Sequence, residues 1–132
     1  MDASILAFFA RLPRQSPGSA AQTLTALGHL PELPPDARVA DLACGTGGAT
    51  LALAERLQAP ILALDQAPEF LERLQAEATA RGLADKVEAV VGDMASPPVP
   101  ARSLDLLWCE GAAYILGFDA ALAHWRELLK PT

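Results

Sequence analysis

The sequence lacks any apolar run long enough to cross a membrane, and it is poor in cysteine and in basic residues. No stretch approaches the ~18 consecutive apolar residues of a membrane-spanning helix, and the first residues lack the positive start and apolar core of a signal peptide. Two cysteines cannot form a disulfide framework, which is typical of a reducing cytoplasm. The formal net charge is −6, whereas a nucleic-acid-binding surface is normally basic. The composition therefore predicts a cytoplasmic protein that binds neither membranes nor nucleic acids.

What the sequence does contain is typical of one globular α/β domain. Of its 132 residues, 52% are hydrophobic and 20% are charged. Short apolar runs suited to strands alternate with amphipathic segments suited to helices, which indicates a parallel sheet with right-handed crossovers. Strands are expected at residues 39–43, 61–64, 87–91 and 104–109. Helices are expected at residues 5–12, 19–30, 48–58 and 68–81, and in a last segment with Phe118, Leu122, Trp125 and Leu129 at helical spacing.

Prolines at positions 31, 34 and 35 separate two parts of the chain. Residues 1–35 are predicted to form an N-terminal helical segment that acts as a cap or lid, and residues 36–132 to form the core. Local signals mark several helix ends. Ser19 is a candidate N-cap, Pro68 suits the first turn of a helix, and Gly82 suits the position just after a helix end.

The most specific pattern is the glycine-rich stretch Asp-Leu-Ala-Cys-Gly-Thr-Gly at residues 41–47. An apolar strand ends in an acid and continues into a glycine turn and a helix. Gly45 and Gly47 let the backbone approach a ligand closely, and the helix offers N–H groups at its start. The carboxylate of Asp41 repels a diphosphate but attracts an ammonium group. This stretch therefore favours a ligand that carries both an amino group and a carboxylate.

The stretch resembles motif I of the class I S-adenosylmethionine (SAM)-dependent methyltransferases. The resemblance implies that Asp41, Ala43, Gly45, Thr46 and Gly47 hold the methionyl end of SAM. It implies a three-layer Rossmann-like fold with the parallel sheet order 3-2-1-4, in a chain that stops before the fifth strand of the family. Strand four is then an exposed apolar edge, and we expect self-association that covers it.

Acidic residues follow the next two expected strands. Asp65 closes the second strand, where an acid in nucleotide-binding α/β folds accepts hydrogen bonds from ribose hydroxyls. The resemblance places Gln66 along the ribose or adenine, and Asp93 and Met94 at the adenine. There the Asp93 carboxylate accepts from the adenine amino group, the Met94 N–H reaches a ring nitrogen, and the Met94 thioether presses on the ring. These acids end different strands and have no histidine beside them, so no metal site is predicted.

The resemblance also indicates where the methyl group is transferred. Glu110 follows the fourth strand and is a candidate for both catalysis and cofactor binding, with three roles left open: to polarise the acceptor, to act as a base, or to stabilise the sulfonium electrostatically. Tyr114 is a second candidate catalytic residue and would line the acceptor pocket. Residues 108–118 together with residues 14–18 resemble a bacterial subgroup of small-molecule methyltransferases, in which Arg14 and Gln15 would lie near the cofactor carboxylate.

The predicted function is transfer of a methyl group from SAM to an unidentified small-molecule acceptor, with S-adenosylhomocysteine (SAH) as the product. Two alternatives remain open. One is a non-catalytic SAM- or nucleoside-binding fragment. The other is an NAD-dependent oxidoreductase, although Thr50 replaces the third glycine of the dinucleotide fingerprint that begins at Gly45.

Overall fold

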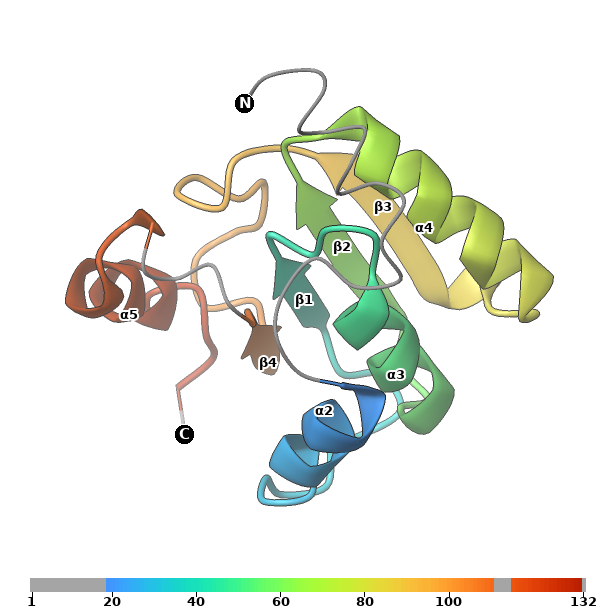
Figure 1. Cartoon of the computed structure of the whole chain (residues 1–132). Coiled ribbons are helices and arrows are strands. Elements are labelled where there is room, and N and C mark those ends of the chain that lie inside the picture. Colours follow the sequence, from blue (N-terminus) through green and yellow to red (C-terminus); the bar gives the residue numbers. More distant parts are fainter. Residues whose placement is uncertain (1–18, 111–114, 132) are drawn as a thin grey trace.

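The computed structural model describes residues 19–110 and 115–131, and it shows a parallel sheet with helices on both faces (Figure 1). The sheet has four strands in the order β3-β2-β1-β4, which confirms the predicted α/β class and strand order. Residue Val39 is in register with Ile61 on one side and with Leu106 on the other. The strands are β1 (Val39–Leu42), β2 (Ile61–Asp65), β3 (Val87–Val91) and β4 (Leu106–Trp108).

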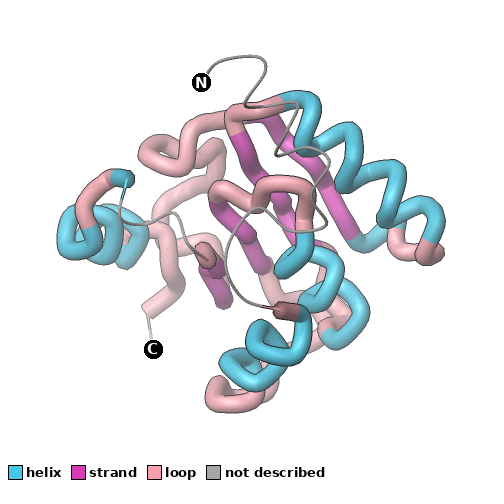
Figure 2. The backbone as a smooth tube through the Cα atoms, in the orientation of Figure 1, coloured by secondary structure: helices cyan, strands magenta, loops and turns pink. Residues whose placement is uncertain are grey.

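The helices form two layers, which Figure 2 shows as cyan segments around the magenta strands. Three of them cover one face of the sheet: α2 (Ala20–Leu27), α3 (Gly48–Arg56) and α4 (Pro68–Ala80). The opposite face is covered by α5 (Phe118–Arg126) and by the connection between β3 and β4. A short 3₁₀ helix, η1 (Ala84–Lys86), leads into β3.

Successive side chains of β1 point to opposite faces, as the pleat of a strand requires. Val39 packs in the cluster beneath α3, whereas Ala40 and Leu42 pack in the cluster beneath α5. All four residues of β1 are buried, because the strand lies inside the sheet and is covered by helices on both sides. Asp41 therefore faces the α3 layer.

The predicted signals at helix ends are confirmed. The Ser19 side chain accepts a hydrogen bond from the Gln22 N–H and caps α2. Pro68 begins α4, where the missing N–H costs nothing. Gly82, at φ +73°, follows α4, and the Leu83 N–H bonds the Ala78 carbonyl at 2.7 Å in a Schellman arrangement.

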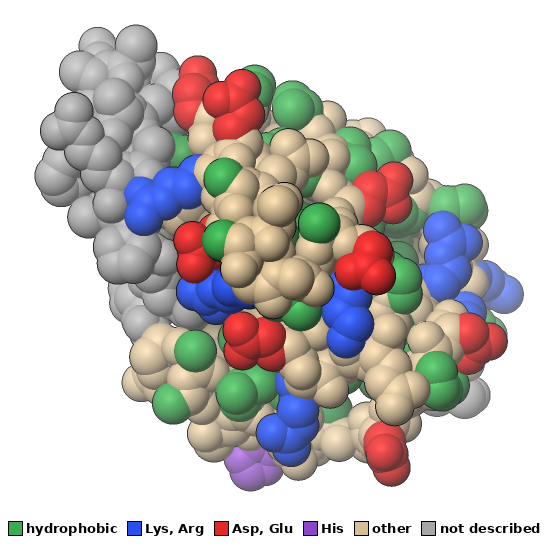
Figure 3. Space-filling model, turned by 90° about the vertical axis from the view of Figure 1, so that its right-hand side faces the viewer, with side chains coloured by type: hydrophobic (Ala, Val, Ile, Leu, Met, Phe, Trp, Pro, Cys, Tyr) green, Lys and Arg blue, Asp and Glu red, His purple; other side chains and the backbone are tan. Residues whose placement is uncertain are grey.

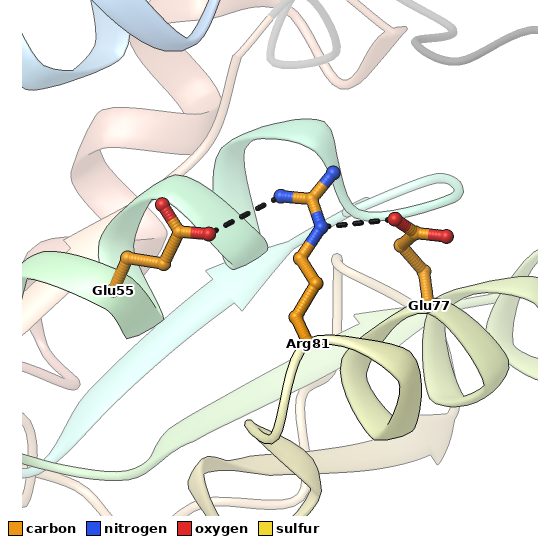
Figure 4. A network of polar contacts seen from close by, with 3 residues as sticks. All are labelled: Glu55, Glu77 and Arg81. Carbon is orange, nitrogen blue, oxygen red and sulfur yellow. Dashed lines mark hydrogen bonds and ion pairs between the residues drawn. The ribbon is translucent and has the colours of Figure 1, made fainter.

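An ion-pair network joins α3 to the end of α4 (Figure 4). The Arg81 guanidinium lies 2.9 Å from the Glu77 carboxylate and 3.4 Å from the Glu55 carboxylate. All three side chains are about half exposed, so water screens the network and it contributes at most about 1 kcal/mol. Acidic and basic side chains are interspersed on the face of the molecule drawn in Figure 3.

The prediction for the buried face of the last helix is wrong in part. Phe118 and Leu122 are 63% and 52% exposed, whereas Ala121 and Trp125 face the core. Leu129 lies beyond the end of α5 and forms a parallel bridge with Leu104.

Two other predicted segments are shorter or packed differently. Helix α2 ends at Leu27 instead of reaching residue 30, and its one buried residue is Thr23. Strand β4 covers only Leu106–Trp108 of the predicted 104–109. The helix predicted at residues 5–12 lies outside the described residues.

Candidate functional site

The carboxyl ends of the four parallel strands meet at one edge of the sheet, which we call the carboxyl edge. From β1, the strands β2 and β3 are added on one side and β4 on the other, so the order in which strands are added to the sheet reverses between β1 and β4. Ligands of open α/β sheets bind outside the carboxyl ends at such a point. The structure places Asp65, Asp93 and Glu110 at or just after the ends of β2, β3 and β4.

The loop between β1 and α3 has an unusual backbone. Ala43, Gly45 and Gly47 have φ angles of +54°, +62° and +88°. The left-handed region is readily available to glycine, but it is costly for an alanine. The loop is held by a hydrogen bond from the Gly47 N–H to the Cys44 carbonyl at 3.1 Å. These conformations turn the backbone of residues 43–47 across the carboxyl end of β1.

Gly47 has a second reason to be glycine that the sequence did not reveal. A Cβ atom at this position would overlap the Leu74 side chain of α4. The residue is thus required for packing between the start of α3 and α4 as well as for its positive φ.

Asp65 braces the loop. Its Oδ2 accepts a hydrogen bond from the Gly45 N–H at 2.9 Å, and its Oδ1 accepts one from the Ala67 N–H at 2.9 Å. A carboxylate has about four acceptor positions, so these two bonds leave capacity for hydroxyl donors from a ligand. The neighbouring Gln66 side chain is exposed at the same edge.

Asp41 lies beneath the loop and is only 1% exposed. The Thr50 hydroxyl of α3 donates a hydrogen bond to its Oδ2 at 2.6 Å. This contact joins β1 to α3 directly below the glycine turn. The role of Asp41 toward an ammonium group stays a prediction. Thr46 is also buried, so its predicted contact would come from its backbone.

Cys44 is partly buried on the same side of the sheet and packs against the cluster that contains Leu51 and Leu74. Burial raises the pKa of its thiol well above the usual value, and the nearby Asp41 and Asp65 carboxylates raise it further. A protonated thiol is a poor nucleophile. Cys44 therefore serves as a small packing residue of the loop.

The turn after β3 is held from the opposite layer. The Asp93 Oδ1 accepts from the Ala95 N–H at 2.8 Å, and the Trp125 indole N–H donates to the Met94 carbonyl at 2.9 Å. The Met94 side chain is 6% exposed and packs in the core with Trp125 and Leu64. Its thioether is thus a core group rather than an open surface for a ring, which leaves the Met94 N–H as its predicted ligand contact.

Glu110 receives two hydrogen bonds on one oxygen. The Thr23 hydroxyl of α2 donates to Oε2 at 2.6 Å, and the Trp108 indole N–H donates to the same atom at 2.8 Å. Sequence reasoning did not identify Thr23, although a polar residue on the inner face of a helix is a usable signal. The predicted site residues Arg14, Gln15 and Tyr114 lie outside the described residues.

In the described part of the chain, no group of three or more His, Cys, Asp or Glu side chains is arranged to hold a metal ion. Nor does any described helix combine the length and apolar character needed to cross a membrane.

A family of methyltransferase domains matches residues 39–132. The chain belongs to this family. The match begins at β1 and includes the glycine loop, Asp65, Asp93 and Glu110.

Relatives of this methyltransferase domain act on different small molecules. This chain is 36% identical over 96 residues to aklanonic acid methyltransferase DauC of Streptomyces sp. (strain C5). It is 35% identical over 108 residues to a trans-aconitate 2-methyltransferase of Streptomyces avermitilis. The matches include 70% and 80% of this chain, but they span only 43% and 40% of those two proteins.

Among solved structures, the domain is similar to a SAM-dependent methyltransferase of Thiobacillus denitrificans in complex with SAH. The TM-score is 0.81 at 27% identity, and the match covers 99% of this chain and 53% of the other. Geranyl diphosphate C-methyltransferase of Streptomyces coelicolor has the same fold, with a TM-score of 0.75 at 20% identity over 84% of this chain and 42% of that chain.

Proposed function

We propose that this methyltransferase domain binds SAM at the carboxyl edge and belongs to an enzyme that methylates a small molecule. The observation that carries the proposal is the left-handed loop at residues 43–47, braced by the Asp65 carboxylate through the Gly45 N–H. This arrangement presents backbone groups and a carboxylate side by side, as an amino-acid-linked nucleoside requires. The SAH complex of the Thiobacillus protein supports the same ligand class.

The carboxylates at the carboxyl edge of the sheet fit SAM better than NAD. Three of the four described strands end in or are followed by carboxylates, at Asp65, Asp93 and Glu110. Carboxylates attract the amino and sulfonium groups of SAM and accept hydrogen bonds from ribose hydroxyls, but they repel a diphosphate. The buried Asp41 adds negative charge beneath the loop.

Each residue has a proposed role along an extended ligand. The backbone of Ala43, Gly45, Thr46 and Gly47 passes under the methionyl end, with Asp41 beneath it. Asp65 binds the ribose hydroxyls, with Gln66 beside it, and Asp93 and the Met94 N–H bind the adenine edge. Arg14 and Gln15 remain proposed contacts to the cofactor carboxylate.

When bound, SAM supplies a methyl group on a positive sulfonium, which a nucleophile of the acceptor displaces to leave the neutral thioether SAH. The sulfonium is already an activated leaving group, so the chain has mainly to position the two reactants and exclude water. Glu110, after β4, is proposed to lie beside the methyl group or the acceptor, with Tyr114 lining the acceptor pocket. Aklanonic acid and trans-aconitate, named for two relatives, support a small-molecule acceptor.

A second candidate is a SAM-binding module without activity of its own. The matched region spans less than half of the relatives DauC and trans-aconitate 2-methyltransferase, so activity and SAM binding of this chain are tested separately. Binding of SAM without turnover by this chain, tested against a broad panel of acceptors, would support it over the enzyme.

Titration calorimetry with SAM, SAH and NAD tests the proposal. We expect binding of SAM and SAH but not of NAD. Asp65→Ala should weaken SAM binding by at least about tenfold, because it removes both the ribose acceptor and the brace on Gly45. Asp85→Ala, in the exposed η1 segment, is the matched control and should leave SAM affinity unchanged. Unchanged affinity of the Asp65 variant would exclude the ribose role, and NAD binding would favour the oxidoreductase.

A further inference from the structure

Helix α2 buries a threonine where an amphipathic helix would normally bury a leucine. Thr23 is 1% exposed and is the one buried residue of α2, whereas Leu24 and Leu27 are only partly buried. A hydroxyl is costly to bury without a partner. A buried threonine at this position is therefore expected to have a hydrogen-bond partner.

That hydrogen bond reaches across the fold to Glu110. The Thr23 hydroxyl lies 2.6 Å from Glu110 Oε2, and the two residues are 87 positions apart in the sequence. The Trp108 indole N–H approaches the same oxygen at 2.8 Å. Two donors from different elements converge on one carboxylate oxygen, and this fixes the position and the orientation of the carboxylate.

The place of this cluster in the fold is informative. Trp108 is the last residue of β4 and is in register with Asp41 of β1. The cluster thus lies at the carboxyl edge between β1 and β4, next to the strand that leads into the glycine loop. The Glu110 carboxylate therefore lies where the sheet order reverses, beside the proposed cofactor site.

We propose that Thr23 and Trp108 are positioning residues that fix the Glu110 carboxylate toward the sulfonium of SAM, so that the site favours the charged cofactor over its neutral product. The inference rests on the proposed function. Loss of the positive charge on methyl transfer removes the attraction to Glu110, and this assists release of SAH. Helix α2 then takes part in cofactor discrimination as well as in covering the sheet.

The ratio of SAH to SAM dissociation constants is the decisive measurement, because a merely structural role would weaken both ligands equally. It is measured by calorimetry on the full chain, with thermal unfolding of each variant. Glu110→Gln keeps the shape but removes the charge, and it should lower the ratio at least about fivefold. Thr23→Val should lower it about threefold, and Trp108→Phe by a similar factor.

Two variants serve as controls. Thr23→Ser retains a hydroxyl and should keep the ratio within about twofold of the original. Thr25→Val removes an exposed hydroxyl of the same helix that bonds only the Ala21 carbonyl among the contacts described, and it should leave the ratio unchanged. The double variant Thr23→Val with Glu110→Gln should lower the ratio no further than Glu110→Gln alone.

The outcomes separate the two proposals. If the unmodified chain binds neither SAM nor SAH, the proposed function fails and this inference fails with it. If both ligands bind but Thr23→Val and Trp108→Phe change only the unfolding temperature, the positioning role is wrong and the proposed function stands. If Glu110→Gln leaves the ratio unchanged, Glu110 does not face the sulfonium. Should Thr23→Val fail to fold, Trp108→Phe and Thr23→Ser still decide the question.

Discussion

At the scale of single residues, the glycine loop contains one position where the side chain opposes the backbone. Ala43 has a φ angle of +54°, although an L side chain in this region costs roughly 1–2 kcal/mol. Ala43 also packs against the core beneath α5. The strain persists because the surrounding loop, β1 and α3 determine its conformation.

Ala43→Gly should therefore raise the free energy of unfolding by about 0.5 kcal/mol. The relief of strain exceeds the extra entropy of glycine in the unfolded chain, which is roughly 0.4–1 kcal/mol. Chemical denaturation monitored by circular dichroism measures the change. Ala63→Gly, in extended backbone within β2, is the matched control and should destabilise the protein. A loss of stability in both variants would contradict the strain at Ala43.

The residue scale also shows what sequence patterns could not predict. Asp41 was recognised as part of a binding motif, but a strand buried on both faces carries no alternation to reveal which way it points. Only the packing of β1 under α3 shows that Thr50 is its partner. Thr23 was missed for a similar reason, since its acceptor lies 87 positions away.

At the scale of elements, the helix and strand positions followed from local signals, but the orientation of α5 did not. Phe118 and Leu122 are spaced like a buried stripe, yet the helix turns Ala121 and Trp125 inward. A small alanine permits close approach to the sheet, and the Trp125 indole N–H finds a partner in the Met94 carbonyl. The spacing of apolar residues does not show which set is buried, because Phe118 with Leu122 and Ala121 with Trp125 each lie on one face of the helix.

Asp105 links the start of β1 to the segment after α5. The Arg38 N–H donates to its Oδ2 at 2.8 Å, and the Lys130 ammonium group approaches the same atom at 2.9 Å. These contacts lower the pKa of the Asp105 carboxyl, the Arg38 hydrogen bond most strongly. Since the pKa is lower in the folded state, the ionised group stabilises the fold at pH values above the pKa of the carboxyl in the unfolded chain, which is about 3.9. This contribution to stability is lost as the pH falls through the pKa of Asp105 in the folded protein.

Asp105→Asn should accordingly lower the unfolding temperature at pH 7, and the difference from the original protein should shrink as the pH falls below about 4. Asparagine keeps an oxygen acceptor for the Arg38 N–H, so the variant isolates the effect of charge. Thermal unfolding between about pH 3 and pH 7 provides the comparison. Asp36→Asn, at an exposed site, is the control. A difference that does not depend on pH would exclude the ionised carboxylate as its source.

At the scale of the whole molecule, the alternation of strands and helices was enough to predict a parallel α/β sheet, and the order 3-2-1-4 was implied by the resemblance to the class I methyltransferases. Right-handed crossovers and short connections leave few arrangements for such a pattern. The site was predictable in part for the same reason, because parallel strands bring Asp65, Asp93 and Glu110 to one edge whatever the details of packing. The contacts between layers, such as Thr23 with Glu110, depend on how the helices rotate on the sheet, and the sequence does not encode that in any short pattern.

The outer edge of β4 leads to the last prediction. Within residues 19–110 and 115–131, the only pairing on that side is the bridge between Leu104 and Leu129. The Asp105 and Leu106 N–H groups both bond the Arg38 carbonyl, at 2.8 and 3.3 Å. From Leu106 onward the parallel register, with Leu106 opposite Val39, directs the Leu107 N–H to the outer edge. An apolar strand edge of this kind pairs readily with another chain.

We predict association of this chain through the β4 edge, with a mean mass in light scattering that rises with concentration. Leu107→Pro removes the outward N–H at an edge position that tolerates proline, and it should reduce the association in protein that remains folded. Leu122→Lys adds a charge to the exposed face of α5 without altering the strand, and it should leave edge pairing intact. Loss of association in the Leu122 variant alone would assign it to the helix face instead, and a monodisperse monomer at every concentration would exclude both.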